Sequence, residues 1–159
     1  MNVLFVCSDN SVLSTMAESI FNGIAPTRFR ACSAGCVPRG SLDAYTLDLL
    51  AAHRMPITGL HPKGLESARF PLAPKMSFVI TLSDLAAAEA WAEWPGEPLV
   101  AHWQVWDRDA AGSPSPEAMV RDAFWTLRRR IQIFTSLLQR KLSPPVLERR
   151  ARTLAPSHL

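Results

Sequence analysis

The residues with the clearest chemical potential lie in one short stretch near the N-terminus. Cys7 follows the apolar run Val3–Val6, and the polar residues 8–11 lead from it toward Ser14. A thiol placed after a buried strand and before a helix N-terminus faces free backbone N–H groups and the positive end of the helix dipole. This environment predicts a lowered pKa for Cys7 and a nucleophilic thiolate.

The elements that position this thiol must be a strand, a loop and a helix, in that order. Val3–Val6 is apolar and β-branched, which favours a buried strand, and Ser14 is expected near the N-cap of a helix over Ser14–Asn22. The backbone amides of the loop between them would hold an anion. The predicted anion-binding loop consists of Ser8, Asp9, Asn10, Ser11, Val12 and Leu13.

This stretch resembles the low-molecular-weight protein-tyrosine-phosphatase superfamily, and within it the thioredoxin-coupled arsenate reductases. Those proteins carry Cys, five residues, Arg and then Ser or Thr. Here Cys7, Asn10 and Ser14 match, but Leu13 stands in place of the arginine. The segments FRACSAGCVPRG, FVITLSDLAAAEAWAEWPGEP and AHWQVWDRDAAG resemble later blocks of the family, in the same order. The resemblance implies an α/β fold, a flavodoxin-like three-layer sandwich whose four-stranded parallel sheet carries helices on both faces.

The resemblance also implies a reaction. Cys7 would attack phosphorus or arsenic, Ser14 would stabilise the thiolate, and Asp107 would protonate the leaving oxygen as general acid. The proline that follows this acid in the family is Arg108 here, so the carboxyl group is less firmly aimed, and Asp109 is a second candidate acid. The catalytic set implied by the resemblance is therefore Cys7, Ser14 and Asp107.

Leu13 removes the forked cation that holds the oxyanion in this family. The loss of one preorganised donor at such a site costs about 10² to 10³ in rate. Asp9 adds a negative charge to the same loop, and Arg39 or Arg108 is the candidate replacement for the missing cation. The sequence therefore predicts weak or absent activity and leaves open whether the chain is an enzyme.

The resemblance to arsenate reductases implies two further redox cysteines, but their positions hold Ser83 and Trp91. A three-cysteine shuttle is therefore not expected. The remaining cysteines, Cys32 and Cys36, lie near the end of the second predicted strand, and a disulfide from either of them to Cys7 stays open. Three cysteines without an export signal favour a reduced, cytoplasmic protein, and neither a metal nor a cofactor is expected.

The apolar pattern predicts the remaining elements. Strands are expected over Phe29–Ser33, Met76–Leu82 and Pro98–His102, and helices over Ser41–His53, Leu85–Trp91 and Ser115–Leu142. The apolar positions of the last helix step by three and four, which indicates one buried face: Val120, Phe124, Leu127, Ile131, Phe134 and Leu138. A phosphatase-like domain is expected over residues 1–145, followed by a C-terminal tail over 146–159 that adds one helical turn.

The net charge is +3, and the basic residues are concentrated between Arg121 and Arg152. This pattern is typical of the solvated face of a helix, and it disfavours nucleic acid because neither a base-reading motif nor an interleaved aromatic residue accompanies the charges. No apolar run reaches the length of a membrane span. The expected ligand is an oxyanion (phosphate, sulfate or arsenate) or a phosphotyrosine-like group.

Two functions remain open on this sequence. The first is a cysteine-dependent phosphate-monoester hydrolase or oxyanion-binding protein whose catalysis is impaired or lost. The alternative is a non-catalytic binding or regulatory pseudophosphatase, in which the former active-site cleft, lined by Val12, Leu13 and Trp106, takes a less charged ligand or a protein partner. Exposed tryptophans leave a homodimer open as well.

Overall fold

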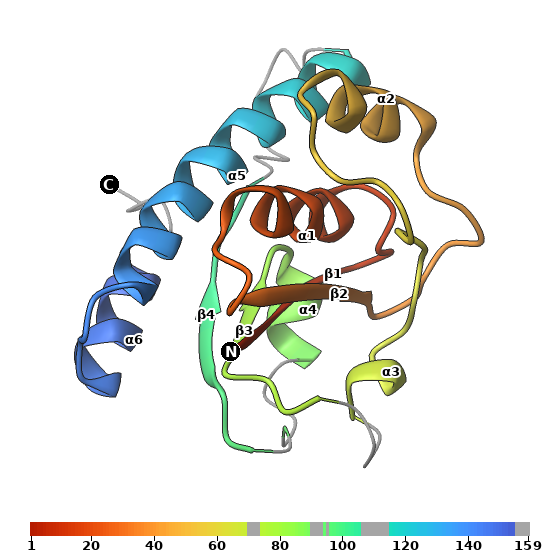
Figure 1. The fold of residues 1–159 in the computed structure, drawn as a ribbon. Coiled ribbons are helices and arrows are strands. Elements are labelled where there is room, and N and C mark those ends of the chain that lie inside the picture. Colours follow the sequence, from red (N-terminus) through yellow and green to blue (C-terminus); the bar gives the residue numbers. More distant parts are fainter. Residues whose placement is uncertain (70–73, 90–93, 95, 106–114, 155–159) are drawn as a thin grey trace.

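The computed structural model describes residues 1–69, 74–89, 94, 96–105 and 115–154. Four strands form one parallel sheet in the order β2-β1-β3-β4, and they alternate with helices along the chain (Figure 1). The strands are β1 (Asn2–Cys7), β2 (Arg30–Gly35), β3 (Phe78–Thr81) and β4 (Leu99–His102). The helices are α1 (Leu13–Ile24), α2 (Ala44–Ala52), α3 (Glu66–Arg69), α4 (Asp84–Glu89), α5 (Pro116–Leu138) and α6 (Pro144–Arg152). This architecture confirms the expected flavodoxin-like α/β class.

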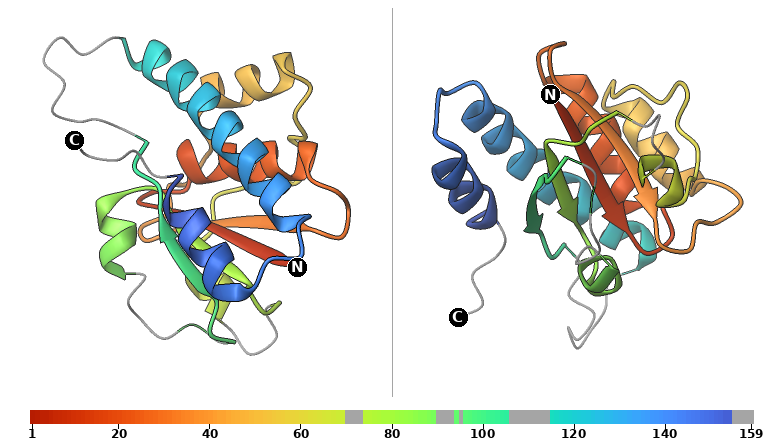
Figure 2. Two further views of the ribbon diagram at one scale, coloured as in Figure 1. Left: turned by 90° about the vertical axis from the view of Figure 1, so that its left-hand side faces the viewer. Right: turned by 90° about the horizontal axis from the view of Figure 1, so that it is seen from below.

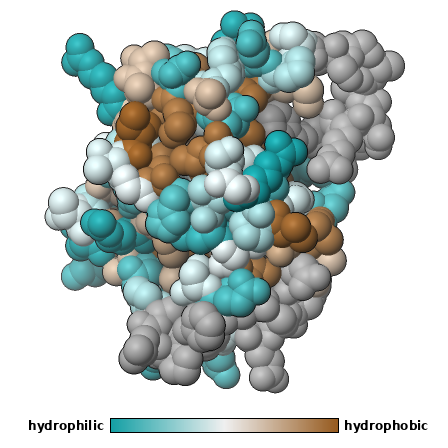
Figure 3. Space-filling model, turned by 90° about the vertical axis from the view of Figure 1, so that its right-hand side faces the viewer, coloured by the Kyte–Doolittle hydropathy of each residue, from teal (hydrophilic) through white to brown (hydrophobic). Residues whose placement is uncertain are grey.

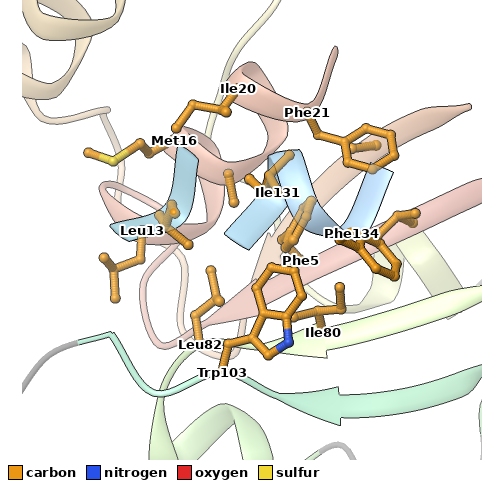
Figure 4. Close-up of a cluster of buried hydrophobic side chains, with 14 of the residues drawn as sticks. Phe5, Leu13, Met16, Ile20, Phe21, Ile80, Leu82, Trp103, Ile131 and Phe134 are labelled. Carbon is orange, nitrogen blue, oxygen red and sulfur yellow. The ribbon is translucent and has the colours of Figure 1, made fainter. Parts of the chain in front are cut away.

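The two faces of the sheet bury two separate hydrophobic cores, because side chains alternate along each strand. The larger core lies under α1 and α5, where the ring of Trp103 packs 6.1 Å from Phe5 and 5.6 Å from Phe134, measured between centroids (Figure 4). The smaller core on the opposite face joins Leu4 and Val6 of β1 to α4. All six predicted apolar positions of α5 are buried.

Strand β1 lies inside the sheet, with β2 on one side and β3 on the other. The strand order therefore reverses beside the carboxyl end of β1, which is where open α/β sheets place their ligands. Cys7 is the last residue of β1 and pairs in register with Gly35, the last residue of β2. The topology thus brings the predicted nucleophile to the switch point of the sheet.

Residues 144–152 form a complete helix rather than the single turn expected of the tail. Helix α5 ends at Leu138, and Pro144 then begins α6, because its fixed φ and missing N–H suit the first position of a helix. Leu147 and Ala151 of α6 are buried in the larger core. The indole Nε1–H of Trp103 donates a hydrogen bond of 3.0 Å to the carbonyl of Ala151, which anchors the helix.

The surface carries no sign of a membrane span. Among the described residues, no helix combines the length and the apolar character needed to cross a bilayer. On the face of the molecule turned away from α6, hydrophobic residues gather in the upper part, and polar residues surround them (Figure 3).

We expect Trp103→Phe to lower the free energy of unfolding by about 1–3 kcal/mol, because it removes the hydrogen bond from the buried indole to Ala151 and leaves a smaller ring in the core. Urea unfolding would measure this. The control is Trp125→Phe, which alters an exposed indole and should stay within about 0.5 kcal/mol of the wild type. Equal midpoints for the two variants would contradict the anchoring role of Trp103.

Candidate active site

The thiol of Cys7 lies at the centre of a buried hydrogen-bond network. Its Sγ is 2.8 Å from the hydroxyl of Ser14, and the amide of Asn10 donates to the same hydroxyl over 2.7 Å. The backbone N–H of Lys63 donates to Oδ1 of Asn10, so the network reaches the segment that follows α2. The structure therefore brings together Cys7, Asn10 and Ser14, the three family positions that the sequence retains.

The backbone of the loop is shaped by Asn10 and Gly35. Asn10 has φ of 55°, a left-handed conformation that asparagine tolerates better than most residues. Gly35 lies directly beneath it, and a Cβ at Gly35 would come within 2.8 Å of the Asn10 nitrogen. Gly35 is thus required for the close approach of β2 to the loop, a role that its place in the Ser-Ala-Gly segment signals only through the family resemblance.

The structure corrects the expected electrostatics of Cys7. Burial, which leaves the residue 3% exposed, raises the pKa of the Cys7 thiol above its ordinary value. Hydrogen bonds from Ser14 and Asn10 lower the pKa and the nearby charge of Asp9 raises it, so the net direction is upward. This direction is opposite to the lowered pKa expected from the sequence, because burial outweighs the hydrogen bonds to the sulfur.

Asp9 occupies part of the loop that was expected to bind an anion. Its Oδ1 accepts a hydrogen bond of 3.1 Å from the backbone N–H of Ser11, and its Oδ2 lies 3.0 Å from Nε of Arg39. Arg39, one of the two candidate replacements for the missing cation, does reach the loop, but its guanidinium is already paired with the carboxylate of Asp9. The other candidate, Arg108, lies outside the described residues.

The segment carrying Arg39 is also tied to the loop by its backbone. The N–H groups of Val37, Arg39 and Asp43 donate to the carbonyls of Ser8, Asp9 and Ser11. Asp43 then accepts from the N–H of Thr46 and caps α2. The sequence did not predict that residues 37–43 form a second loop beside residues 8–11. Its only sign in the sequence was the polar residues that precede the N-cap of α2.

Leu13 does not line the loop, contrary to expectation. It is the first residue of α1, only 2% exposed, and its side chain joins the larger core with Met16 and Phe5 (Figure 4). The N-cap is Val12, without a side-chain hydrogen bond, and not Ser14, whose hydroxyl is taken up by Cys7 and Asn10. An apolar residue at this position therefore turns inward, away from any bound anion.

Two serines of the loop have unequal surroundings. The hydroxyl of Ser8 donates to that of Ser83 over 3.0 Å, so Ser83 contacts the loop although it has no redox chemistry. The hydroxyl of Ser11 is buried and has no hydrogen-bond partner within the described part of the chain. A buried, unpaired oxygen beside a helix N-terminus marks a place where a ligand or water would be stabilised.

None of the three cysteines forms a disulfide with another described residue. Cys7 packs in the core under α1, whereas Cys32 and Cys36 pack against the core on the other face of the sheet, so their side chains diverge. A disulfide from Cys7 to either is therefore absent here. Burial raises the pKa of Cys32 to about 11, and no cluster of metal ligands occurs among the described residues.

The remaining candidates fall outside the described residues. They are the expected acid and its neighbours, the cleft tryptophan and one former redox position: Asp107, Arg108, Asp109, Trp106 and Trp91.

Comparison with known proteins identifies the scaffold that carries this loop. The sequence model of the low molecular weight phosphotyrosine protein phosphatases matches residues 2–132, which is most of the chain. This chain belongs to the low-molecular-weight phosphotyrosine protein phosphatase family. A search among curated proteins gave no match.

Solved structures share the fold of this phosphatase-family chain at low sequence identity. An arsenate reductase from Archaeoglobus fulgidus is 21% identical, with a TM-score of 0.66 over 84% of this chain and 98% of its own. The YwlE arginine phosphatase of Geobacillus stearothermophilus is 19% identical, with a TM-score of 0.67 over 87% and 92%. The low-molecular-weight protein tyrosine phosphatase of T. tengcongensis is 22% identical, with a TM-score of 0.63 over 83% and 95%.

We expect Cys7 to react slowly with iodoacetamide near pH 7 and faster as the pH rises above 9, because its raised pKa keeps the thiol protonated at neutral pH. Ser14→Ala should slow labelling further, since the hydroxyl of Ser14 lowers that pKa. Peptide mapping by mass spectrometry would follow Cys7 separately from Cys32, and protein in denaturant gives the reference rate. Fast labelling of Cys7 that does not change between pH 6 and 8 would contradict this.

Proposed function

We propose that this family member binds an oxyanion at the end of β1 but has lost efficient catalysis. The observation that carries the proposal is the burial of Leu13 in the hydrophobic core, at the position where the family holds its forked cation. The raised pKa of Cys7 acts in the same direction, because it favours the thiol over the nucleophilic thiolate. The two losses affect the two groups that a cysteine phosphatase needs most.

Anion binding remains supported by the geometry of the loop. The N-terminus of α1 has no side-chain cap, and the unpaired hydroxyl of Ser11 lies beside it. A structural neighbour described as an arsenate reductase in the phosphate binding state shares the fold, with a TM-score of 0.64 at 20% identity. We therefore propose phosphate, sulfate or arsenate as ligand, held more weakly than by a loop with arginine.

Asp9 gives a physical reason for weak binding. Its carboxylate takes the amide of Ser11 and the guanidinium of Arg39, both of which would otherwise serve an incoming anion. An oxyanion must displace this carboxylate or accept its repulsion at close range. The carboxylate of Asp9 thus occupies part of the position that an anion would take in this loop.

A residual hydrolase is the second candidate, favoured by the intact contact between Cys7 and Ser14. In that reaction the thiolate would attack phosphorus, the bond to the leaving oxygen would break, and Asp107 would supply its proton. Water would then cleave the phosphocysteine and restore the thiol.

The non-catalytic alternative, a pseudophosphatase that uses the cleft to bind a ligand or partner, needs none of these steps. We also propose a cytoplasmic location, which agrees with the lack of a disulfide among the described residues.

Hydrolysis of p-nitrophenyl phosphate separates these candidates. We expect wild type and Cys7→Ser to show the same background rate. Leu13→Arg should gain turnover that Cys7→Ser removes, because a guanidinium cannot stay in the apolar core and turns toward the loop. Leu13→Lys, which adds charge without a fork, is the matched control and should gain less. If the wild type turns over and Cys7→Ser abolishes this activity, catalysis has not been lost.

We further expect Asp9→Asn to tighten phosphate binding by about 10-fold or more, because it removes a negative charge from the loop and frees Arg39. Isothermal titration with inorganic phosphate would measure the change, and Asp48→Asn, on the exposed surface of α2, is the charge-matched control. The double variant Asp9→Asn with Arg39→Ala should lose most of the gain. Unchanged binding in Asp9→Asn would show that Asp9 does not compete with the anion.

A further inference from the structure

The charge of the chain is divided sharply along its length. Residues 115–154, which form α5 and α6, hold nine basic and three acidic side chains, whereas the rest of the sequence holds eight basic and eleven acidic ones. Helices α5 and α6 lie next to each other on the outside of the molecule, and Figure 2 (left) shows that surface facing the viewer. One side of the protein is therefore strongly basic, although the whole chain carries only +3.

Two exposed apolar side chains lie within this basic surface. Trp125, Arg129 and Ile133 follow each other at intervals of four along α5, so they share one face of the helix. Trp125 is 53% exposed and Ile133 is 42% exposed, which is unusual for side chains of this size on a solvated helix. We call the row of Trp125, Arg129 and Ile133 the α5 ridge.

The tryptophan of the α5 ridge is held in place by its neighbours. The guanidinium carbon of Arg128 lies 5.8 Å from the ring centroid of Trp125, and the ring of His53 meets Trp125 edge-on at 5.1 Å. His53 itself stacks on the buried ring of Phe124. An exposed indole that is fixed in this way loses little conformational entropy when a partner covers it.

A groove runs beside the α5 ridge, between α5 and the end of α6. Its volume is about 370 Å³, and it is lined by Thr126, Arg129, Arg130, Ile133, Thr153 and Leu154. The Nη1–H of Arg130 donates a hydrogen bond of 2.8 Å to the carbonyl of Gln104, which fixes a positive charge at the wall of the groove. The groove thus offers both an apolar floor and cations at its edge.

We propose that the α5 ridge and its groove bind an acidic polypeptide segment that carries an aromatic or aliphatic anchor residue. Charge complementarity determines the sign of the partner, since arginines surround the apolar centre. Exposed tryptophan together with arginine is the composition of protein-interface hot spots. Trp125 and Ile133 are exposed among these arginines and offer contacts to an apolar side chain, which favours a polypeptide with an anchor residue over a phosphate backbone.

The structure places an aromatic side chain among the arginines of this surface, which the sequence did not predict. The arginines alone were typical of a solvated helix, because no aromatic residue was placed among them. The contact of Arg128 with the exposed ring of Trp125 now places one there. The proposal is independent of Cys7, which lies at the carboxyl end of the sheet and is buried in the core.

The test is fluorescence anisotropy with a fluorescein-labelled random copolymer of glutamate and tyrosine, compared with labelled polyglutamate of the same length. We expect the copolymer to bind more tightly because it supplies the anchor, and both affinities to fall as salt rises. Trp125→Ala should weaken the copolymer about 10-fold and leave polyglutamate within about two-fold. The double variant Arg128→Glu with Arg129→Glu should weaken both polymers by 10-fold or more.

The control matches the charge change at another basic site. The double variant Arg28→Glu with Arg30→Glu, at the start of β2, should bind both polymers within about two-fold of the wild type, apart from the general effect of net charge. An equal loss in this control would show that only net charge matters and would overturn the proposal. Absence of copolymer binding at low salt would overturn it as well.

Two further measurements distinguish other occupants. A labelled 20-mer of deoxythymidine that binds more tightly than the copolymer, and loses affinity in Trp125→Ala, would assign the surface to single-stranded nucleic acid instead. Sedimentation equilibrium that shows a dimer dissociated by Trp125→Ala would assign it to a second copy of this chain. Circular dichroism of each variant should match the wild type, because all substituted side chains lie outside the core.

Discussion

The burial of Leu13 beneath α1 is the interaction on which the geometry around Cys7 depends. Once this side chain joins the core, the first turn of α1 is fixed against the sheet, and Ser14 is turned toward the thiol. Cys7 is itself buried in the same core, and this burial raises the pKa of its thiol. Leu13 thus holds the first turn of α1 by apolar packing, and it supplies no hydrogen-bond donor to the loop beside Cys7.

Hydrogen-bonding groups of the loop are bound by other residues of the same chain. Asp9 binds the amide of Ser11 and the side chain of Arg39, and the backbone of the second loop supports the arrangement from outside. In an open anion site these groups would have no partner until a ligand bound, and this would lower the stability of the fold. Here the carboxylate of Asp9 takes the place of a ligand for these groups, while the buried hydroxyl of Ser11 has no partner among the described residues and the N-terminus of α1 has no side-chain cap.

Much of the fold follows from the sequence, because the strands are short apolar runs and α5 shows a clear helical period of buried residues. The resemblance located Cys7, Asn10 and Ser14, which the structure brings together. The direction of the pKa shift at Cys7 could not be predicted, since it depends on burial by residues far away in sequence. The inward turn of Leu13 and the capture of Arg39 by Asp9 also depend on tertiary packing. The exposed position of Trp125 is of the same kind, because an amphipathic pattern does not say which tryptophan stays outside.

Helix α6 affects whether neighbouring molecules can associate through the edge of the sheet. Strand β4 is the outermost strand of the sheet on its side, and α6 packs against it, with Nε of Arg152 donating to the carbonyl of Val100. Uncovered outer strands invite other chains to extend the sheet, which is a common route to aggregation. Helix α6 therefore protects part of this edge, and its removal would expose more of β4 to neighbouring chains.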